Sequence, residues 1–205
     1  MDTTATTDFV HIHEPGADAA RPPLLLLHGT GGDERDLLGL GRVVAPGATL
    51  LSPRGKVLEG PMPRFFRRLS EGVFDEDDLR RRTHELADFV ETARERYGLA
   101  QPVALGFSNG ANIAASLLLL RPQVLAGAAL LRAMSPFAEP PEADLGGKRV
   151  LILSGAMDPI VPDADVGRLA RTLSDHGASV DHRTLPAGHG LSQADIDLLA
   201  GWFAA

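Results

Sequence analysis

The sequence has no cysteine among its 205 residues. This absence excludes disulfide bonds, thiolate metal sites and a cysteine nucleophile. Basic residues are also scarcer than acidic ones, 20 Lys and Arg against 27 Asp and Glu, which gives a net charge of −7 at pH 7. Because that charge repels phosphate backbones and anionic lipid headgroups, we expect no nucleic-acid partner.

Targeting signals and long apolar runs are missing as well. The first ten residues, MDTTATTDFV, have neither the basic start nor the apolar stretch of a secretion signal, so we expect a cytoplasmic protein. The most apolar helical segment, residues 111–120, is about half the length needed to cross a bilayer, and we expect no membrane insertion. Since no linker or shift in composition divides the chain, the sequence predicts one domain over residues 1–205.

Short β-like runs alternate with amphipathic helices along the chain, which predicts an α/β fold with a mainly parallel sheet. Apolar residues spaced by four and three over residues 79–97 predict a helix that ends near Gly98. A second helix is expected over about 164–175, with Asp163 as its N-cap. The expected strands cover residues 9–13, 23–28, 49–52, 103–106, 126–131, 149–153 and 180–184.

The pentapeptide GFSNG, residues 106–110, lies between a short apolar run and an apolar helical segment. This is the G-x-S-x-G pattern of a nucleophile elbow, a sharp turn from strand to helix that exposes a serine hydroxyl. Small residues are needed beside the serine because a larger side chain would crowd the turn. The pattern therefore predicts Ser108 as a nucleophile.

A serine hydroxyl becomes a good nucleophile only when a histidine accepts its proton and an acid orients that histidine. The order expected after an elbow serine is acid, then histidine. His189 lies in the loop PAGHG between the last expected strand and the final helix, and it is our candidate base rather than a plain loop residue. We expect surface or structural positions for His11, His13, His84, His176 and His182.

The candidate acid is Asp158, in the loop that leaves the strand over residues 149–153. Because ligands of open α/β sheets bind beyond the carboxyl ends of the strands, Ser108, Asp158 and His189 are all expected on one rim. Asp163 is the nearest rival, but its place in the sequence PDAD suits the start of a helix better.

The oxyanion of an acyl-transfer reaction needs two backbone N–H donors. One should come from Asn109, directly after the serine, and the other from Thr30 in the loop HGTGGD that follows the strand of leucines. A phosphate-binding loop is the alternative for HGTGGD, but the sequence matches neither G-x-G-x-x-G nor a Walker motif with its lysine.

The motifs LLLLHGTGGDE, GFSNGA, SGAMDPIVP and AGHGLS follow one another in this order. With them, the chain from about residue 23 onward resembles the α/β-hydrolase carboxylesterases of the phospholipase/carboxylesterase and acyl-protein thioesterase type. The segments PRG, MPRFFRR and EGVFD within residues 53–75 resemble the bacterial branch that includes hydroquinone-responsive hydrolases. The acyl-protein thioesterases usually carry glutamine after the serine, where this chain has Asn109, which argues against a protein-deacylating role.

The resemblance implies an α/β-hydrolase fold of about seven strands flanked by helices, with no inserted cap domain. It also implies a triad of Ser108, Asp158 and His189, an oxyanion hole from Thr30 and Asn109, and no metal or organic cofactor. A homodimer is in keeping with the resemblance.

Residues 53–75 form the one long connection without obvious structure, and such loops are usually functional. Its phenylalanines are expected either to wall an acyl or aryl pocket or to fasten the loop to the core, and Arg64 or Arg54 either to meet a substrate anion or to remain in water. We expect a shallow, open cleft that favours small or flexible acyl esters. The candidate pocket residues are Met62, Arg64, Phe65, Phe66, Ile160, Val161 and Leu191.

The function that these residues favour is that of a serine carboxylesterase, which hydrolyses small or medium carboxylic esters through an acyl-enzyme on Ser108. A thioesterase or a lysophospholipase would use the same triad with a different pocket or leaving group. A non-catalytic binding protein of the same fold is the remaining alternative. The expected partner is a small-molecule ester.

Overall fold

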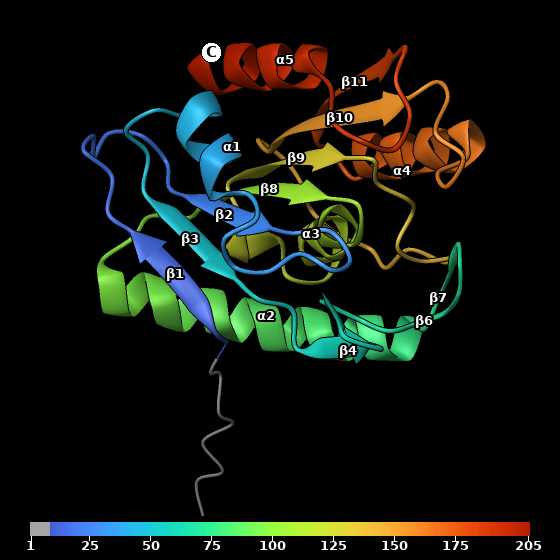
Figure 1. Cartoon of the computed structure of the whole chain (residues 1–205), viewed down its shortest axis with the longest axis horizontal. Coiled ribbons are helices and arrows are strands. Elements are labelled where there is room, and N and C mark those ends of the chain that lie inside the picture. The colour runs from blue at the N-terminus through green and yellow to red at the C-terminus, as the bar shows by residue number, and fades with distance from the viewer. Residues whose placement is uncertain (1–8) are drawn as a thin grey trace, which may run out of the picture.

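The computed structural model describes residues 9–205, which form a seven-stranded sheet with helices on both faces (Figure 1). The strand order is β1-β3-β2-β8-β9-β10-β11. The first strand runs antiparallel to β3 and all other neighbours in this sheet are parallel, so the predicted α/β class is confirmed. The strands are β1 (His11–Glu14), β2 (Leu24–Leu27), β3 (Leu50–Pro53), β8 (Val103–Phe107), β9 (Gly127–Leu131), β10 (Arg149–Gly155) and β11 (Ser179–Leu185).

Two apolar clusters, one on each face of the sheet, make up the core. One cluster joins the sheet to α2, α3 and α4, and the other joins it to α1 and α5. Alternate residues of β2 divide between them, since Leu25 and Leu27 belong to the first cluster and Leu24 and Leu26 to the second. A strand buried on both faces explains the unbroken leucine run. The helices are α1 (Leu38–Val44), α2 (Glu76–Tyr97), α3 (Asn109–Leu120), α4 (Asp163–Asp175) and α5 (Gln193–Ala204), and a 3₁₀ turn covers Pro122–Val124.

The capping residues expected from the sequence are found at the end of α2 but not at the start of α4. The Asp75 side chain accepts the backbone N–H of Asp78 at the start of α2, and Gly98 ends this helix in the left-handed conformation. The prediction that Asp163 caps α4 is wrong, because Pro162 occupies the N-cap position and Asp163 is the first helical residue. Its carboxylate lies in the first turn, where the helix dipole favours negative charge.

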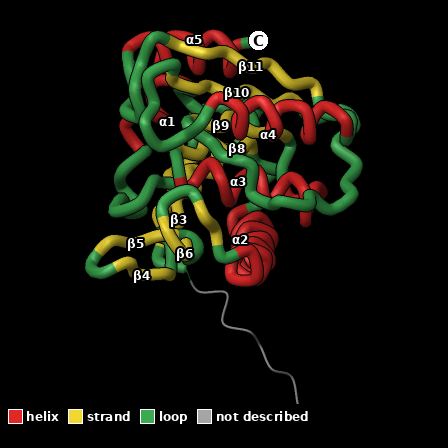
Figure 2. The backbone as a smooth tube through the Cα atoms, turned by 90° about the vertical axis from the view of Figure 1, so that its right-hand side faces the viewer, coloured by secondary structure: helices red, strands yellow, loops and turns green. Residues whose placement is uncertain are grey.

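Residues 53–75, predicted to lack obvious structure, contain two small hairpins, β4–β5 and β6–β7. Figure 2 shows β4, β5 and β6 below the end of β3 and beside α2. Strands of two or three residues are too short to show an alternating pattern, which is why the sequence did not reveal them. The hairpins are β4 (Val57–Glu59) with β5 (Met62–Arg64), and β6 (Arg68–Ser70) with β7 (Val73–Phe74).

Within residues 9–205, no helix is both long and apolar enough to cross a membrane.

Candidate active site

The GFSNG segment forms a tight turn between β8 and α3. Ser108 has a φ of 51° and a ψ of −116°, a strained conformation for a residue with a side chain. The glycines beside it leave no room for substitution: a Cβ at Gly110 would lie 1.9 Å from the carbonyl oxygen of Leu27, and one at Gly106 would lie 2.6 Å from that of Gly110. The packing of helix against strand therefore requires both glycines and directs Ser108 away from the core.

Ser108, His189 and Asp158 lie in one hydrogen-bonded line. The Ser108 Oγ is 2.9 Å from His189 Nε2, and His189 Nδ1 is 2.8 Å from Asp158 Oδ2. Since a carboxylate can only accept, Nδ1 carries the ring proton and Nε2 accepts from the serine hydroxyl. The structure thus brings together three side chains from the ends of three different strands, in the arrangement that activates a serine.

Asp158 is held in place by the loop that follows it. Its Oδ1 accepts the backbone N–H of Ile160 at 2.8 Å and that of Val161 at 3.1 Å, and its side chain is fully buried. These hydrogen bonds satisfy a buried carboxylate that would otherwise be costly. They also leave Oδ2 directed at His189.

Arg132, which sequence reasoning missed, holds the loop around His189. It follows β9 with a φ of 55° and is fully buried. Its Nε donates to the carbonyl of Gly188 at 2.9 Å and its Nη2 to that of Gly190 at 3.1 Å, so the two residues beside His189 are anchored to one guanidinium. An arginine after an apolar strand matches no recognised pattern, so sequence reasoning had no signal that could identify it.

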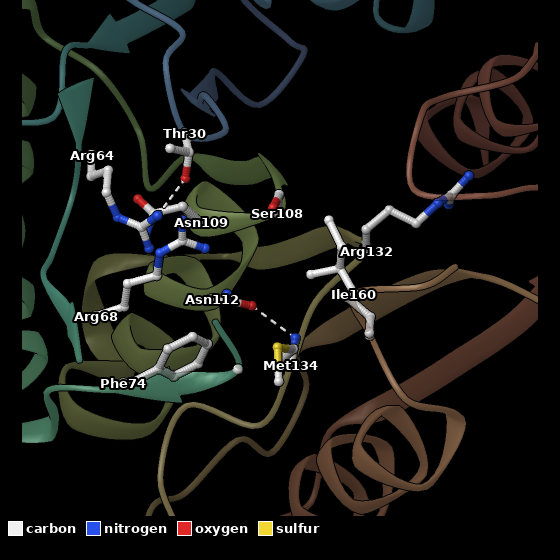
Figure 3. Close-up of a pocket in the computed structure, with 12 residues that line it drawn as sticks. Thr30, Arg64, Arg68, Phe74, Ser108, Asn109, Asn112, Arg132, Met134 and Ile160 are labelled. Carbon is white, nitrogen blue, oxygen red and sulfur yellow. Dashed lines mark hydrogen bonds between the residues drawn. The ribbon is translucent and has the colours of Figure 1, made fainter. Parts of the chain in front are cut away.

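Thr30 and Asn109 lie beside Ser108 and line the same pocket (Figure 3). The N–H of Asn109 begins α3 and has no partner within the helix. In the part of the chain that the structure describes, the backbone N–H groups of Thr30 and Asn109 donate to no protein acceptor. Both are therefore available to an oxyanion formed at Ser108.

The loop that carries Thr30 is fixed by His28. The His28 Nδ1 is 2.6 Å from the carbonyl of Gly29, and the N–H of Gly55 donates to His28 Nε2 at 3.0 Å. Nδ1 must carry the proton in this arrangement, so the ring is neutral. Burial lowers the pKa of His28 below its usual value, which keeps the ring in that form.

The pocket beside Ser108 is small, with a volume of about 30 Å³. Three of the seven candidate pocket residues, Arg64, Ile160 and Val161, are among the residues that line it. The complete lining consists of Thr30, Arg64, Arg68, Gly72, Phe74, Ser108, Asn109, Asn112, Arg132, Met134, Ile160 and Val161.

The other four candidates do not line this pocket. Phe65 and Phe66 are buried in the core cluster with α2 and α3, so they fasten the loop, as the alternative interpretation proposed. Met62, in β5, and Leu191, after His189, point outward and are 39% and 36% exposed.

Arg54 is also unavailable to a substrate anion. It pairs with the buried carboxylate of Glu34, and its hydrogen bonds lower the pKa of Glu34 to about 2. Its charge is therefore already paired with that of Glu34.

Across residues 9–205, no group of three or more His, Asp or Glu side chains is arranged to hold a metal ion.

Comparisons with known proteins show the family and fold of the chain. Residues 22–148 match the protein family described as alpha/beta hydrolase fold. MhqD of Bacillus subtilis (strain 168) is 47% identical over 195 residues, which cover 94% of this chain and 96% of MhqD. The carboxylesterase of Bacillus cereus superposes with a TM-score of 0.94 at 44% identity, covering 98% of this chain and 95% of that one. The carboxylesterase of Mesorhizobium loti gives 0.91 at 37% identity, covering 98% and 96%.

Proposed function

Because the chain belongs to the alpha/beta hydrolase family, we propose that it is a serine carboxylesterase that uses Ser108, His189 and Asp158 as its triad. The observation that carries the proposal is the hydrogen-bonded line from Ser108 Oγ through the His189 ring to Asp158. The carboxylesterases of similar structure support the ester as substrate class.

In the first half of the reaction, His189 Nε2 takes the proton of the Ser108 hydroxyl while Oγ bonds to the ester carbonyl carbon. The carbonyl oxygen becomes an oxyanion, which the backbone N–H groups of Thr30 and Asn109 stabilise. When the C–O bond to the alcohol breaks, the alcohol leaves with the proton from His189, and the acyl group remains on Ser108.

In the second half, water gives a proton to His189 and its oxygen attacks the acyl carbon. The bond to Ser108 Oγ then breaks, Oγ recovers the proton, and the carboxylic acid departs. Asp158 keeps the Nδ1 proton on the ring throughout and stabilises the imidazolium that forms twice in the cycle.

The size of the pocket supports this activity over that of a lysophospholipase. A pocket of about 30 Å³ is far smaller than the several hundred Å³ typical of sites for drug-sized ligands. A short acyl group fits this space, whereas a long fatty acyl chain would have to extend over the surface. A thioesterase acting on short acyl groups remains compatible with the same triad.

The test is labelling of the purified protein with a fluorophosphonate probe, which phosphonylates activated serines, followed by peptide mapping and a panel of esters and thioesters of graded acyl length. We expect the label on Ser108 and the highest kcat/KM for short acyl esters. Hydrolysis of short thioesters with clearly higher kcat/KM than the matched oxygen esters would favour the thioesterase.

Two variants make the test specific. Ser108→Ala should take no label and lose ester hydrolysis, while Ser70→Ala, an exposed serine on β6, should label as the native protein does. A non-catalytic protein of the same fold is the correct conclusion if the native protein takes no label and hydrolyses nothing in the panel.

A further inference from the structure

The pocket beside Ser108 lies on the acyl side of the reaction. The leaving alcohol must approach His189, because this residue gives it a proton. The pocket is lined by both oxyanion donors and by Ser108, but His189 is not among its lining residues. An ester bound with its carbonyl oxygen between Thr30 and Asn109 therefore directs its acyl chain into this pocket.

Two arginines from the hairpin segment, Arg64 and Arg68, line one wall of this pocket. Arg64 is 97% buried: its Nε donates to the carbonyl of Phe66 at 3.2 Å and its Nη1 to the Thr30 hydroxyl at 2.7 Å. In the described residues, Nη2 of Arg64 and Nη1 of Arg68 have no protein acceptor. Each arginine thus keeps one terminal nitrogen free for a ligand.

The two guanidinium groups share a single carboxylate, that of Glu59. Glu59 accepts from Arg68 at 2.6 and 3.0 Å and lies 3.3 Å from Arg64 Nη1. It lines a separate hollow on the outer side of the arginines and not the pocket of Ser108. Two guanidinium groups against one carboxylate leave this cluster with a net positive charge. Burial, together with repulsion from Arg68, lowers the pKa of Arg64.

Two asparagines add further donors to the pocket. The Asn109 Oδ1 accepts the N–H of Phe65 and the Asn112 Oδ1 accepts the N–H of Met134, both at 2.8 Å. These bonds fix the carboxamides so that each presents its NH₂ group at the other end (Figure 3). Asn109 Nδ2 is buried without a hydrogen-bond partner, which is costly unless a ligand or water accepts from it.

The remaining wall of the pocket is apolar. Phe74, Met134, Ile160 and Val161 line it, and no aspartate or glutamate does. Arg132 also contributes to the lining, but its guanidinium is turned away from Arg64 and Arg68 and pairs with Asp195 (Figure 3). A ligand that fits has a short methylene chain against the apolar wall and an anionic end at the two free arginine nitrogens.

We propose that this esterase selects acyl groups that end in a carboxylate, so that its substrates are monoesters of short dicarboxylic acids. The proposal rests on the proposed function, since it assigns the acyl half of the ester handled by Ser108. Arg64 and Arg68 have only the carboxylate of Glu59 between them, and the substrate carboxylate would supply a second negative charge. It would also accept hydrogen bonds from the carboxamide NH₂ groups of Asn109 and Asn112.

The test compares substrates that differ only in this charge. Monomethyl succinate, glutarate and adipate are each paired with the methyl ester of the corresponding monoamide, and kcat/KM is measured from methanol release at pH 7. We expect at least one acid to exceed its amide by about ten- to a hundredfold, the effect of a charge-assisted hydrogen bond in a partly buried site. Arg64→Gln and Arg68→Gln should each reduce that ratio at least about fivefold, and 0.5 M NaCl should reduce it in the native protein.

Arg67→Gln is the matched control, because Arg67 lies next to Arg68, is exposed, pairs with Asp75 and lines only the outer hollow. Its ratio should equal that of the native protein. The proposal is overturned if no acid exceeds its amide, if both arginine variants keep the native ratio, or if Arg67→Gln reduces it as they do. If the amide esters are hydrolysed with the same kcat/KM as the acids, the proposed function stands and only this inference fails. If neither the acids nor the amides are hydrolysed, the inference fails, and fluorophosphonate labelling decides whether the proposed esterase function fails with it.

Discussion

Arg132 and Asp195 form a fully buried, bidentate ion pair. Nη1 and Nη2 of Arg132 each donate to one carboxylate oxygen of Asp195 at 2.8 Å. Asp195 also caps the first turn of α5 through Ser192. Burial acts to raise the pKa of Asp195, but the hydrogen bonds from Arg132 and Ser192, together with the charge of Arg132, outweigh burial and lower that pKa. The pair therefore joins the end of β9 to the start of α5, with the His189 loop between them.

Arg132→Met should destabilise the protein by about 3 to 5 kcal/mol, because it leaves Asp195 buried without its counter-ion. Urea unfolding followed by circular dichroism measures the change. Arg171→Met, at an exposed arginine of α4, should change the stability by less than about 0.5 kcal/mol. Equal losses of stability in the two variants would show that the buried ion pair contributes no more to stability than an exposed arginine does.

Asp195→Asn in the Arg132→Met background separates the lost charge partner from the lost packing. The amide can still accept the hydrogen bonds of the α5 cap, but it carries no charge to be stranded. We expect the double variant to be more stable than Arg132→Met alone, by about 1 to 3 kcal/mol. A double variant that is less stable than the single one would refute this explanation.

The hydrogen-bonded line of Ser108, His189 and Asp158 could be predicted from the sequence because each of the three residues follows a strand and is marked by local chemistry. Ser108 lies between two obligatory glycines, and Asp158 and His189 lie in loops at the carboxyl ends of β10 and β11. Arg132 could not be predicted, because its role depends on Gly188, Gly190 and Asp195, which are more than fifty residues away. Such contacts exist only after folding.

Asp158→Asn should lower kcat by about a thousand- to ten-thousandfold. Its carboxamide would still accept the N–H of Ile160, but its NH₂ group would face His189 Nδ1 and favour the tautomer that cannot accept from Ser108. Ester hydrolysis and the rate of fluorophosphonate labelling are the measurements. Asp163→Asn, at the first residue of α4, should stay within about twofold of the native protein. Retention of more than a tenth of kcat by Asp158→Asn would exclude it as the orienting acid.

Gly110→Ala should prevent folding or destabilise the protein by more than about 3 kcal/mol, since the new Cβ would lie 1.9 Å from the Leu27 carbonyl. Gly201→Ala is the matched control in α5, where no atom lies within 4 Å of the added Cβ. It should stabilise the protein by about 0.5 to 1 kcal/mol, as expected for alanine replacing glycine in a helix. Thermal unfolding of both variants tests the pair, and a stable Gly110→Ala would mean that helix α3 can move away from β2.

The direction of the side chains in the hairpins of residues 53–75 could not be predicted from a single sequence. The segment MPRFFRR mixes four apolar residues with three arginines without regular alternation, so it does not indicate which side chains point inward. Phe65 and Phe66 turned out to be core residues, whereas Arg64, expected either at a substrate or in water, is itself buried beside Ser108. The backbone of this segment is fixed by contacts such as that of the Phe65 N–H with Asn109, which only the folded chain provides.

The stability of the protein should fall as the pH drops below about 6.5, in part because of His28. Burial lowers the pKa of His28 in the folded protein, while in the unfolded chain the ring takes up a proton near its usual pKa of about 6.5. Between these two pKa values the unfolded chain binds more protons, so the free energy of unfolding decreases with falling pH by up to about 1.4 kcal/mol per unit for this group. Its contribution is complete above pH 6.5 and lost as the pH falls to the folded value.

His28→Gln tests this assignment, because its amide can still accept from Gly55 but does not titrate. The variant should be less stable at pH 8, yet its stability should depend less steeply on pH between about 6.5 and 4.5, a window above the usual pKa of the carboxylates. Burial also lowers the pKa of His182, so His182→Gln serves as the comparison for a histidine on β11 that does not hold the Thr30 loop. Urea unfolding at intervals of half a pH unit gives the slopes. If the native protein and His28→Gln lose stability with falling pH at the same rate, groups other than His28 cause the acid sensitivity. A shallower pH dependence of His28→Gln, together with slower fluorophosphonate labelling, would link the protonation of His28 to the loop that carries Thr30.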